Sequence, residues 1–118
     1  MLNKIKQMHE YFGIDSNTLP EFTIEEMDFR IAAMQEELNE YELAENKAEQ
    51  LDALVDLLVF TLGTAERMGF LDVFEEAYDR VIASNMTKTI GPNQKRGSFA
   101  LDLVKPAGFK PANLDDLV

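Results

Sequence analysis

The segment Leu51–Leu62 is apolar except at Asp52, Asp56 and Thr61, and it constrains the fold more than any other part of the chain. The pattern predicts a helix over about residues 48–68, with Gly69 as its C-cap. A helix that is apolar on nearly all sides is typical of a central, buried position. Because an ionised carboxylate there is costly unless it is compensated, Asp56 must meet a partner that neutralises it.

A second long helix is predicted over about residues 24–46. The tetrapeptide Thr23–Glu26 is typical of a capping box, in which a hydroxyl and a glutamate satisfy the first free amides. The apolar residues that follow are spaced by three and four, which places them on one stripe: Ile24, Met27, Ile31, Met34, Leu38 and Tyr41. Glu37 flanks that stripe and Glu40 lies further round on the same side, whereas Glu36 points mostly outward.

Two shorter helices complete the prediction. The first covers about residues 2–12 and ends at Gly13, and the last covers about residues 71–85. Gly91, Pro92 and later glycines and prolines break regular structure beyond it, and no strand is expected. We therefore predict an all-α protein, a four-helix bundle in one domain over 1–118. Its helical core spans about residues 2–86 and its irregular tail about residues 87–118.

Carboxylates gather on the two long helices. If these helices are antiparallel neighbours, Glu37 and Glu40 face Asp52 and Asp56 across the gap. Four carboxylates that close cannot all be ionised without cations between them. Mg²⁺ is a hard cation that takes oxygen ligands and keeps waters or phosphates in its other positions, with Mn²⁺ as a substitute. The pattern therefore indicates a metal site that serves phosphate chemistry.

Structural explanations compete with a metal site. Acid-rich helix faces are often merely solvated, and that is our interpretation of Glu42 and Glu45. Asp56 has the alternative of an ordinary core carboxylate paired with a base such as Lys4, Arg30 or Arg67.

Composition excludes several classes of function. The chain has no cysteine, so disulfides, thiolate metal sites and a cysteine nucleophile are ruled out. His9 is the one histidine, which argues against a histidine-rich zinc site, and we expect a surface or half-buried structural role for it. The net charge is −11, with a strongly acidic stretch before a mildly basic tail, which argues against binding nucleic acid. We expect a cytoplasmic protein without a membrane partner, because no apolar signal or spanning segment is evident.

Cationic candidates for phosphate contact follow the last helix. Asn85 and Lys88 can reach a shared pocket, although from these residues alone we favour a C-cap asparagine followed by a helix-terminal lysine. Lys95 and Arg96 lie in a glycine-bounded stretch that lacks the Walker pattern. That stretch suits either a lid over the substrate or an arm that wraps a partner subunit.

These motifs, taken in order, resemble those of the all-α nucleoside triphosphate pyrophosphohydrolases. This superfamily includes MazG, phosphoribosyl-ATP pyrophosphohydrolase and the dimeric dUTPases. Its EExxE signature is complete at residues 36–40, and the likeness is greatest to short phosphoribosyl-ATP pyrophosphohydrolase-like proteins. Further similar stretches are Asp52–Leu58, Leu62–Ala65, Ser84–Lys88 and Lys105–Leu114.

The second acidic signature, ExxD, departs from the family pattern. If Asp56 fills the aspartate, Ala53 stands where glutamate is expected and Asp52 takes over its role. In the other register Glu49 and Asp52 spell ExxD, which would make Glu49 the ligand. We prefer Asp52 and Asp56, with Glu49 as an outer candidate.

The resemblance implies Mg²⁺-dependent cleavage between the α and β phosphates, which gives a nucleoside monophosphate and pyrophosphate. It implies a homodimer or a dimer of dimers with the site near a subunit interface. The expected metal ligands are Glu37, Glu40, Asp52 and Asp56; the expected catalytic residues are Glu36 and Glu37; the expected substrate-binding residues are Asn85, Lys88, Lys95 and Arg96. Two alternatives stay open: hydrolysis of phosphoribosyl-ATP itself, and a non-enzymatic acidic interaction protein such as a nucleic-acid mimic.

Overall fold

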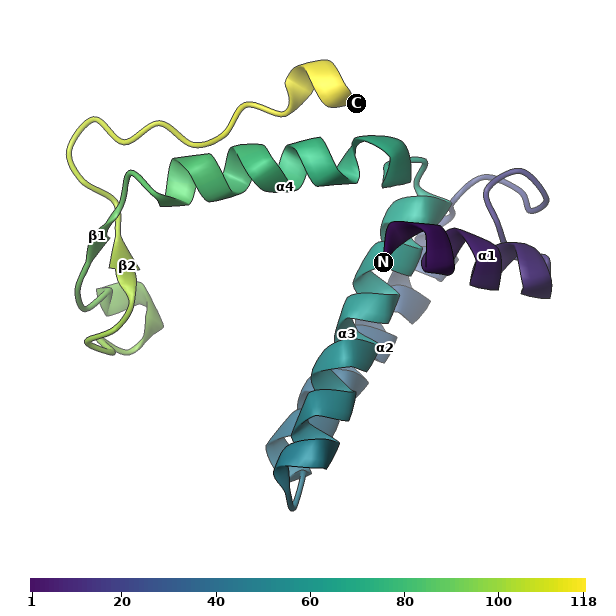
Figure 1. The fold of residues 1–118 in the computed structure, drawn as a ribbon, viewed down its shortest axis with the longest axis horizontal. Helices are drawn as coiled ribbons and strands as arrows, with labels where there is room; N and C mark the ends of the chain where they lie inside the picture. The colour runs from purple at the N-terminus through teal and green to yellow at the C-terminus, as the bar shows by residue number, and fades with distance from the viewer. The chain divides into compact units, whose positions relative to one another are not determined.

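The computed structural model describes residues 1–118, which divide into two compact units, Met1–Asp72 and Val73–Val118. The helices are α1 (Leu2–Phe12), α2 (Ile24–Leu43), α3 (Lys47–Arg67) and α4 (Leu71–Asn85), shown in Figure 1. Four helices and very little strand confirm the predicted all-α class. None of these helices is both long enough and apolar enough to cross a bilayer.

The ends of the helices follow from local capping. The Thr23 hydroxyl accepts a hydrogen bond from the backbone N–H of Glu26 at 3.0 Å, as the capping box predicts. The predicted end of α2 at residue 46 is wrong, because α2 ends at Leu43. Asn46 is instead the N-cap of α3, and its side chain accepts from the N–H of Glu49 at 2.9 Å. An N-cap needs extended backbone, so Asn46 cannot also continue the preceding helix.

In the first unit, α2 and α3 form a tight antiparallel hairpin and α1 packs against α3 (Figure 1). All three helices meet at Gly63 of α3. A Cβ atom at this position would lie 3.0 Å from Nε2 of His9 and 3.1 Å from Nη1 of Arg30. The missing side chain therefore lets α1 and α2 approach α3 closely. The buried apolar residues are few: Ile5, Ala53, Leu62 and Ala65.

The prediction that α3 is buried along its whole length is wrong for the single chain. The C-terminal half carries buried residues such as Leu62 and Ala65, because α1 covers it. The N-terminal half has only α2 beside it, and there Leu51 remains 64% exposed, with Leu54, Val55 and Leu58 also exposed. Two helices side by side shield only one side of each other, so the apolar pattern exceeds what one chain can bury.

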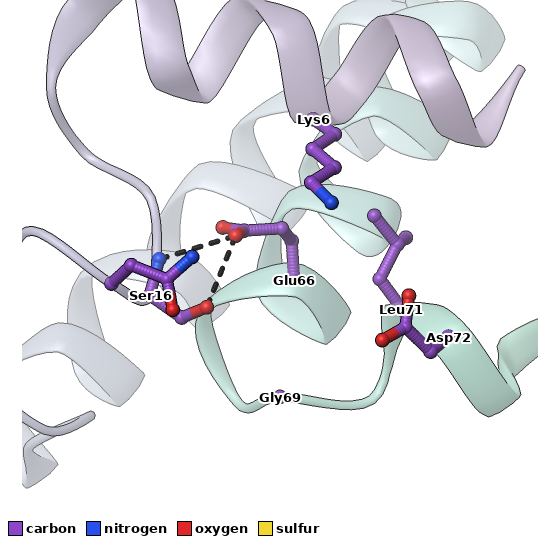
Figure 2. Close-up of a pocket in the computed structure, with 7 residues that line it drawn as sticks. Lys6, Ser16, Glu66, Gly69, Leu71 and Asp72 are labelled. Carbon is purple, nitrogen blue, oxygen red and sulfur yellow. Dashed lines mark hydrogen bonds between the residues drawn. The ribbon is translucent and has the colours of Figure 1, made fainter.

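Glu66, near the end of α3, connects α1 and the loop that follows it to the α2–α3 hairpin through hydrogen bonds. Its Oε1 accepts hydrogen bonds from the backbone N–H and the hydroxyl of Ser16, at 3.1 and 3.2 Å (Figure 2). Its Oε2 lies 2.7 Å from Nδ1 of His9. Glu66 also lines a small cavity of about 130 Å³ beside Lys6 and Gly69. Since both of its oxygens already have partners, Glu66 serves as a structural residue of this cavity wall.

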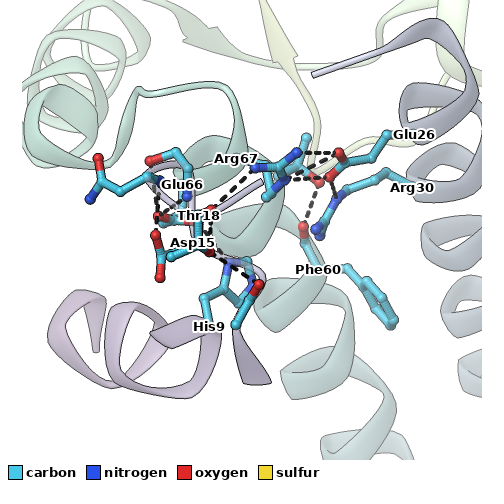
Figure 3. Close-up of polar contacts among 12 residues, drawn as sticks. His9, Asp15, Thr18, Glu26, Arg30, Phe60, Glu66 and Arg67 are labelled. Carbon is cyan, nitrogen blue, oxygen red and sulfur yellow. Dashed lines mark hydrogen bonds and ion pairs between the residues drawn. The ribbon is translucent and has the colours of Figure 1, made fainter. Parts of the chain in front are cut away.

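A second buried network joins α2 to α3 (Figure 3). The Arg67 guanidinium donates to both carboxylate oxygens of Glu26, with Nη2–Oε1 at 2.7 Å and Nε–Oε2 at 2.8 Å. Arg30 donates to the same carboxylate at 3.2 Å. His9, which contacts Glu66 and not Glu26, is only 2% exposed. Its role is structural, as expected, but the side chain is more deeply buried than the surface or half-buried position that we predicted. These residues stabilise the fold at the end of the hairpin where α1 packs.

The second unit holds most of α4 and the tail. The prediction of no strand is wrong, because β1 (Thr89–Ile90) pairs antiparallel with β2 (Leu103–Val104). Between them lies a 3₁₀ turn over Gln94–Arg96, followed by Gly97 and Ser98 at positive φ, which reverses the chain. Another 3₁₀ turn, Asp115–Leu117, ends the tail. Strands of two residues carry too little alternating pattern to be read from sequence.

Candidate functional site

Three carboxylates from α2 and α3 converge in the first unit. Glu37, Glu40 and Asp56 each offer an oxygen, and these oxygens all lie within 4.8 Å of one another. Glu37 and Glu40 are three residues apart on α2, which puts them on one side of that helix. Asp56 reaches them from α3 because the hairpin sets the two helices side by side. We call these three residues the acid cluster.

Within the acid cluster, Glu37 has the environment that is least favourable for a charged carboxylate. Its Oε2 is buried and has no hydrogen-bond partner. Burial raises the pKa of Glu37 to about 7, and contact with the Glu40 carboxylate and the charge of Asp56 act in the same direction. A buried carboxylate oxygen without a partner is costly, so this atom needs a proton or a cation.

The environment of Asp56 also disfavours the charged carboxylate, but less strongly. It is half-buried, and its pKa is raised first by burial and then by the charges of Asp52 and Glu40. Asp52 lies one turn earlier on α3 and is exposed. Its charge raises the pKa of Asp56, but Asp52 is not one of the residues whose oxygens lie within 4.8 Å of one another. The structure thus brings together three of the four predicted ligands and leaves Asp52 at the edge.

No basic side chain neutralises the acid cluster. Arg30 and Arg67, which we considered as partners of Asp56, are both bound to Glu26. Lys4, the third candidate, forms no ion pair. The negative charge of the cluster is therefore uncompensated by the protein itself.

The acid cluster fits a hard divalent cation. All its donors are carboxylate oxygens, one of them is buried without a partner, and they stand close enough to share one ion. These are the ligand properties that Mg²⁺ and Mn²⁺ prefer, whereas zinc sites usually contain histidine or cysteine. Glu37, Glu40 and Asp56 would hold the ion, and Asp52 is placed to assist through its neighbour.

The two remaining acidic candidates lie outside the acid cluster. Glu36 is exposed, as expected for a residue that points outward, and its charge is the weakest of the influences that raise the pKa of Glu37. Glu49 lies in the first turn of α3, and its Oε2 accepts a hydrogen bond from the backbone N–H of Glu45, just before the helix, at 2.9 Å. Glu49 therefore caps α3 and is not part of the group that gathers around Glu37.

The second unit contains a cavity of about 250 Å³, which we call the tail pocket. Asn85 and Lys88, paired in our sequence prediction, both line it. Lys105 and Phe109 line the opposite, tail side, and sequence reasoning assigned them no role. The only signal for them was the likeness of Lys105–Leu114 to the tail of similar proteins, which gave no hint of a contact with α4.

The other two cationic candidates are placed differently. Arg96 donates to both oxygens of Asp102, at 3.0 and 2.6 Å, so its charge is already paired. Lys95 is exposed in the turn between β1 and β2. Neither lines the tail pocket.

Residues 5–85, well over half of the chain, match the family described as phosphoribosyl-ATP pyrophosphohydrolase. The matched range contains the whole acid cluster and ends at Asn85, before the tail. No curated protein sequence matches the chain.

Proposed function

The chain belongs to the phosphoribosyl-ATP pyrophosphohydrolase family, whose members hydrolyse phosphoanhydrides, and we propose that it is a Mg²⁺-dependent nucleoside triphosphate pyrophosphohydrolase. It cleaves a ribo- or deoxyribonucleoside triphosphate between the α and β phosphates and releases the monophosphate and pyrophosphate. The observation that carries this proposal is the acid cluster, with its buried, unpartnered Glu37 oxygen and no basic neighbour.

The residues of this chain take distinct roles in the proposed reaction. Glu37, Glu40 and Asp56 hold the divalent ion, and Asp52 supports Asp56 from the edge of the cluster. When bound, such an ion offsets the carboxylate charge and polarises the phosphate oxygens. Glu36 and Glu37 are the proposed catalytic residues, which orient the attacking water and accept its proton. Water attacks phosphorus, the bond to the bridging oxygen breaks, and pyrophosphate leaves.

Substrate binding is assigned to polar side chains at the end of α4 and in the tail. Asn85 and Lys88 share the tail pocket, which supports their assignment as ligands of the nucleotide or its phosphates. We retain Lys95 and Arg96 as proposed phosphate contacts. Arg96 must exchange its Asp102 partner for the substrate to act in this way.

We also propose that the active protein is a homodimer or a dimer of dimers. The N-terminal half of α3 exposes Leu51, Leu54 and Val55, and α2 exposes Phe29 and Ile31. Large apolar side chains left exposed on two packed helices are typical of an interface between subunits. A second copy would cover the side chains that one hairpin leaves in water.

Hydrolysis of phosphoribosyl-ATP is an equally good second candidate, because the family match is described by that substrate. The acid cluster serves either reaction, since both break a phosphoanhydride. A non-enzymatic acidic protein is disfavoured, because a mimic needs dispersed surface charges and not converging ones that raise each other's pKa.

One assay tests the proposal and separates the substrates. The protein is incubated with Mg²⁺ and each of the eight common NTPs and dNTPs or phosphoribosyl-ATP, and pyrophosphate and monophosphate are quantified. Glu40→Gln and Asp56→Asn should each reduce turnover at least about 100-fold, because loss of a ligand costs no less than loss of its supporting residues. Glu42→Gln, an exposed glutamate on the same helix, is the matched control and should leave turnover unchanged. Activity that survives both cluster variants refutes the site.

A further inference from the structure

The tail pocket has a wall that the family match does not include. One wall is α4, with Val81, Asn85 and the following Lys88. The other is the tail from Lys105 to Leu114, which lies beyond the matched residues 5–85. The family match therefore assigns no role to this wall, and its own contacts indicate what it can bind.

Specific hydrogen bonds hold the tail wall against α4. The Arg80 guanidinium donates to the carbonyl of Asn113 at 3.0 Å and to both carboxylate oxygens of Asp116, at 2.6 and 3.0 Å. The Ser84 hydroxyl donates to the carbonyl of Lys110 at 3.1 Å. Two successive turns of α4 thus hydrogen-bond to the tail, and these bonds hold the two walls of the pocket together.

The charges inside the tail pocket are all of one sign. Lys88 and Lys105 each place Nζ over the Phe109 ring, at 5.4 and 5.6 Å from its centroid. Neither lysine forms an ion pair, and no acidic residue lines the pocket. By contrast, the two arginines of this unit, Arg80 and Arg96, are each bound to carboxylates. Two unpaired ammonium groups converging on one ring leave a positive site that an anion would satisfy.

We propose that the tail pocket binds a phosphate group of the nucleotide substrate, with Lys105 as a binding residue and Phe109 as the residue that positions both lysines. That the phosphate belongs to a nucleotide rests on the proposed function; that the pocket takes phosphate rests on its charges. Lys88, Lys105 and the Asn85 amide supply donors from both walls. At about 250 Å³ the cavity is below the range of about 300–1,000 Å³ typical of pockets that enclose a whole ligand, so it suits only part of a nucleotide.

Calorimetric titration of the full chain tests the pocket independently of catalysis. Inorganic pyrophosphate is titrated in EDTA, so that no metal ion held by the acid cluster can bind the anion in place of the pocket. The variant is Lys105→Met, which keeps the aliphatic length and removes the charge. Lys110→Met is the matched control, because Lys110 is an exposed lysine of the same tail whose side chain lies outside the pocket. Lys105→Met should weaken binding about tenfold, as expected for loss of one charged hydrogen bond, and Lys110→Met less than about twofold. Equal effects of the two variants, or no binding by the wild type, overturn the proposal.

A second titration identifies the source of the phosphate. The probe is α,β-methylene-dATP with Mg²⁺, a nucleotide that cannot be cleaved between the α and β phosphates. Lys105→Met should weaken this probe as it weakens pyrophosphate, whereas an effect on pyrophosphate alone overturns the nucleotide assignment. Phe109→Leu keeps both charges but removes the ring, and it should weaken both probes while preserving their salt dependence, which Lys105→Met should reduce.

Turnover of the same variants separates the two proposals. If the wild type hydrolyses triphosphates and Lys105→Met keeps the wild-type KM, the proposal for the tail pocket is refuted and the proposed function stands. If the wild type binds pyrophosphate through Lys105 but hydrolyses no nucleotide, the proposed function is refuted. The claim that the bound phosphate belongs to a nucleotide is then refuted with it.

Discussion

Mg²⁺ binding should release a proton from the acid cluster at mildly acidic pH. Glu37 has its pKa raised to about 7 by burial and by Glu40 and Asp56, so below that pH it holds a proton that a cation must displace. With a pKa near 7, Glu37 is ~90% protonated at pH 6 and ~10% protonated at pH 8. Binding at pH 6 should therefore release about one proton per ion, and binding at pH 8 about a tenth of that.

The measurement is calorimetric titration of the protein with Mg²⁺ in two buffers that differ in ionisation enthalpy. The difference between the two observed enthalpies gives the number of protons released. The apparent affinity should be on a plateau above pH 8 and should fall by about tenfold between pH 8 and pH 6. Glu37→Gln removes the titrating group, so its proton release should be close to zero at both values of pH. Release that is absent from the wild type at pH 6, or unchanged in Glu37→Gln, would refute this explanation of the cluster.

The same shift sets the pH dependence of stability. Glu37 has a raised pKa in the folded protein, so its contribution to stability is fully present below its ordinary value of 4.5. That contribution is lost as the pH rises through about 7, because the ionised carboxylate is poorly accommodated. The metal-free protein should therefore melt at a lower temperature at pH 8 than at pH 5.5, and Mg²⁺ should raise the melting temperature more at pH 8.

Three further predictions concern other parts of the chain. Glu26→Ala leaves the buried Arg30 and Arg67 without their carboxylate, and urea unfolding should show a loss of about 3 kcal/mol in the free energy of unfolding; a loss below about 1 kcal/mol would contradict the network. Leu54→Glu charges the exposed apolar side of α3, and light scattering after size exclusion should show a monomer where the wild type is a dimer or tetramer; a monomeric wild type would contradict the interface. Arg80→Met releases the tail from α4, and it should weaken pyrophosphate binding while changing the helical circular dichroism little; unchanged binding would show that the tail wall does not depend on this arginine.

Local signals in the sequence were enough to place most helix ends. Gly13 ends α1 in the left-handed conformation, which glycine adopts without a steric penalty, and Thr23 begins α2 through its hydroxyl. The end of α2 was missed because Asn46 is compatible with a helical pattern until its capping of the next helix is considered. A residue that can serve either of two helices is decided by both together.

The acid cluster was accessible from sequence because one assumption, an antiparallel hairpin, brings Glu37 and Glu40 opposite Asp56. The peripheral place of Asp52 was not accessible, because helical periodicity gives a direction around the axis and not a reach across the gap. The exposure of Leu51 was not accessible either, since an apolar pattern records eventual burial without saying whether the cover comes from the same chain.

The tail pocket lay beyond sequence reasoning for a different reason. Lys88 and Lys105 meet at Phe109 only because the chain reverses between β1 and β2 and then returns along α4. Such a contact depends on turns and on hydrogen bonds such as that from Ser84 to the carbonyl of Lys110, which leave no periodic pattern. The lysines could be noted as cations but not paired.

The most direct test of the account is a crystal structure of the protein grown with Mn²⁺, with anomalous scattering used to locate the ion. We predict one strong anomalous peak among the carboxylates of Glu37, Glu40 and Asp56, at about 2.0–2.3 Å from the ligand oxygens. A map with no peak at this place, or a lysine or arginine from a second copy inserted among the three carboxylates, would contradict the claim that they are gathered to hold a metal ion.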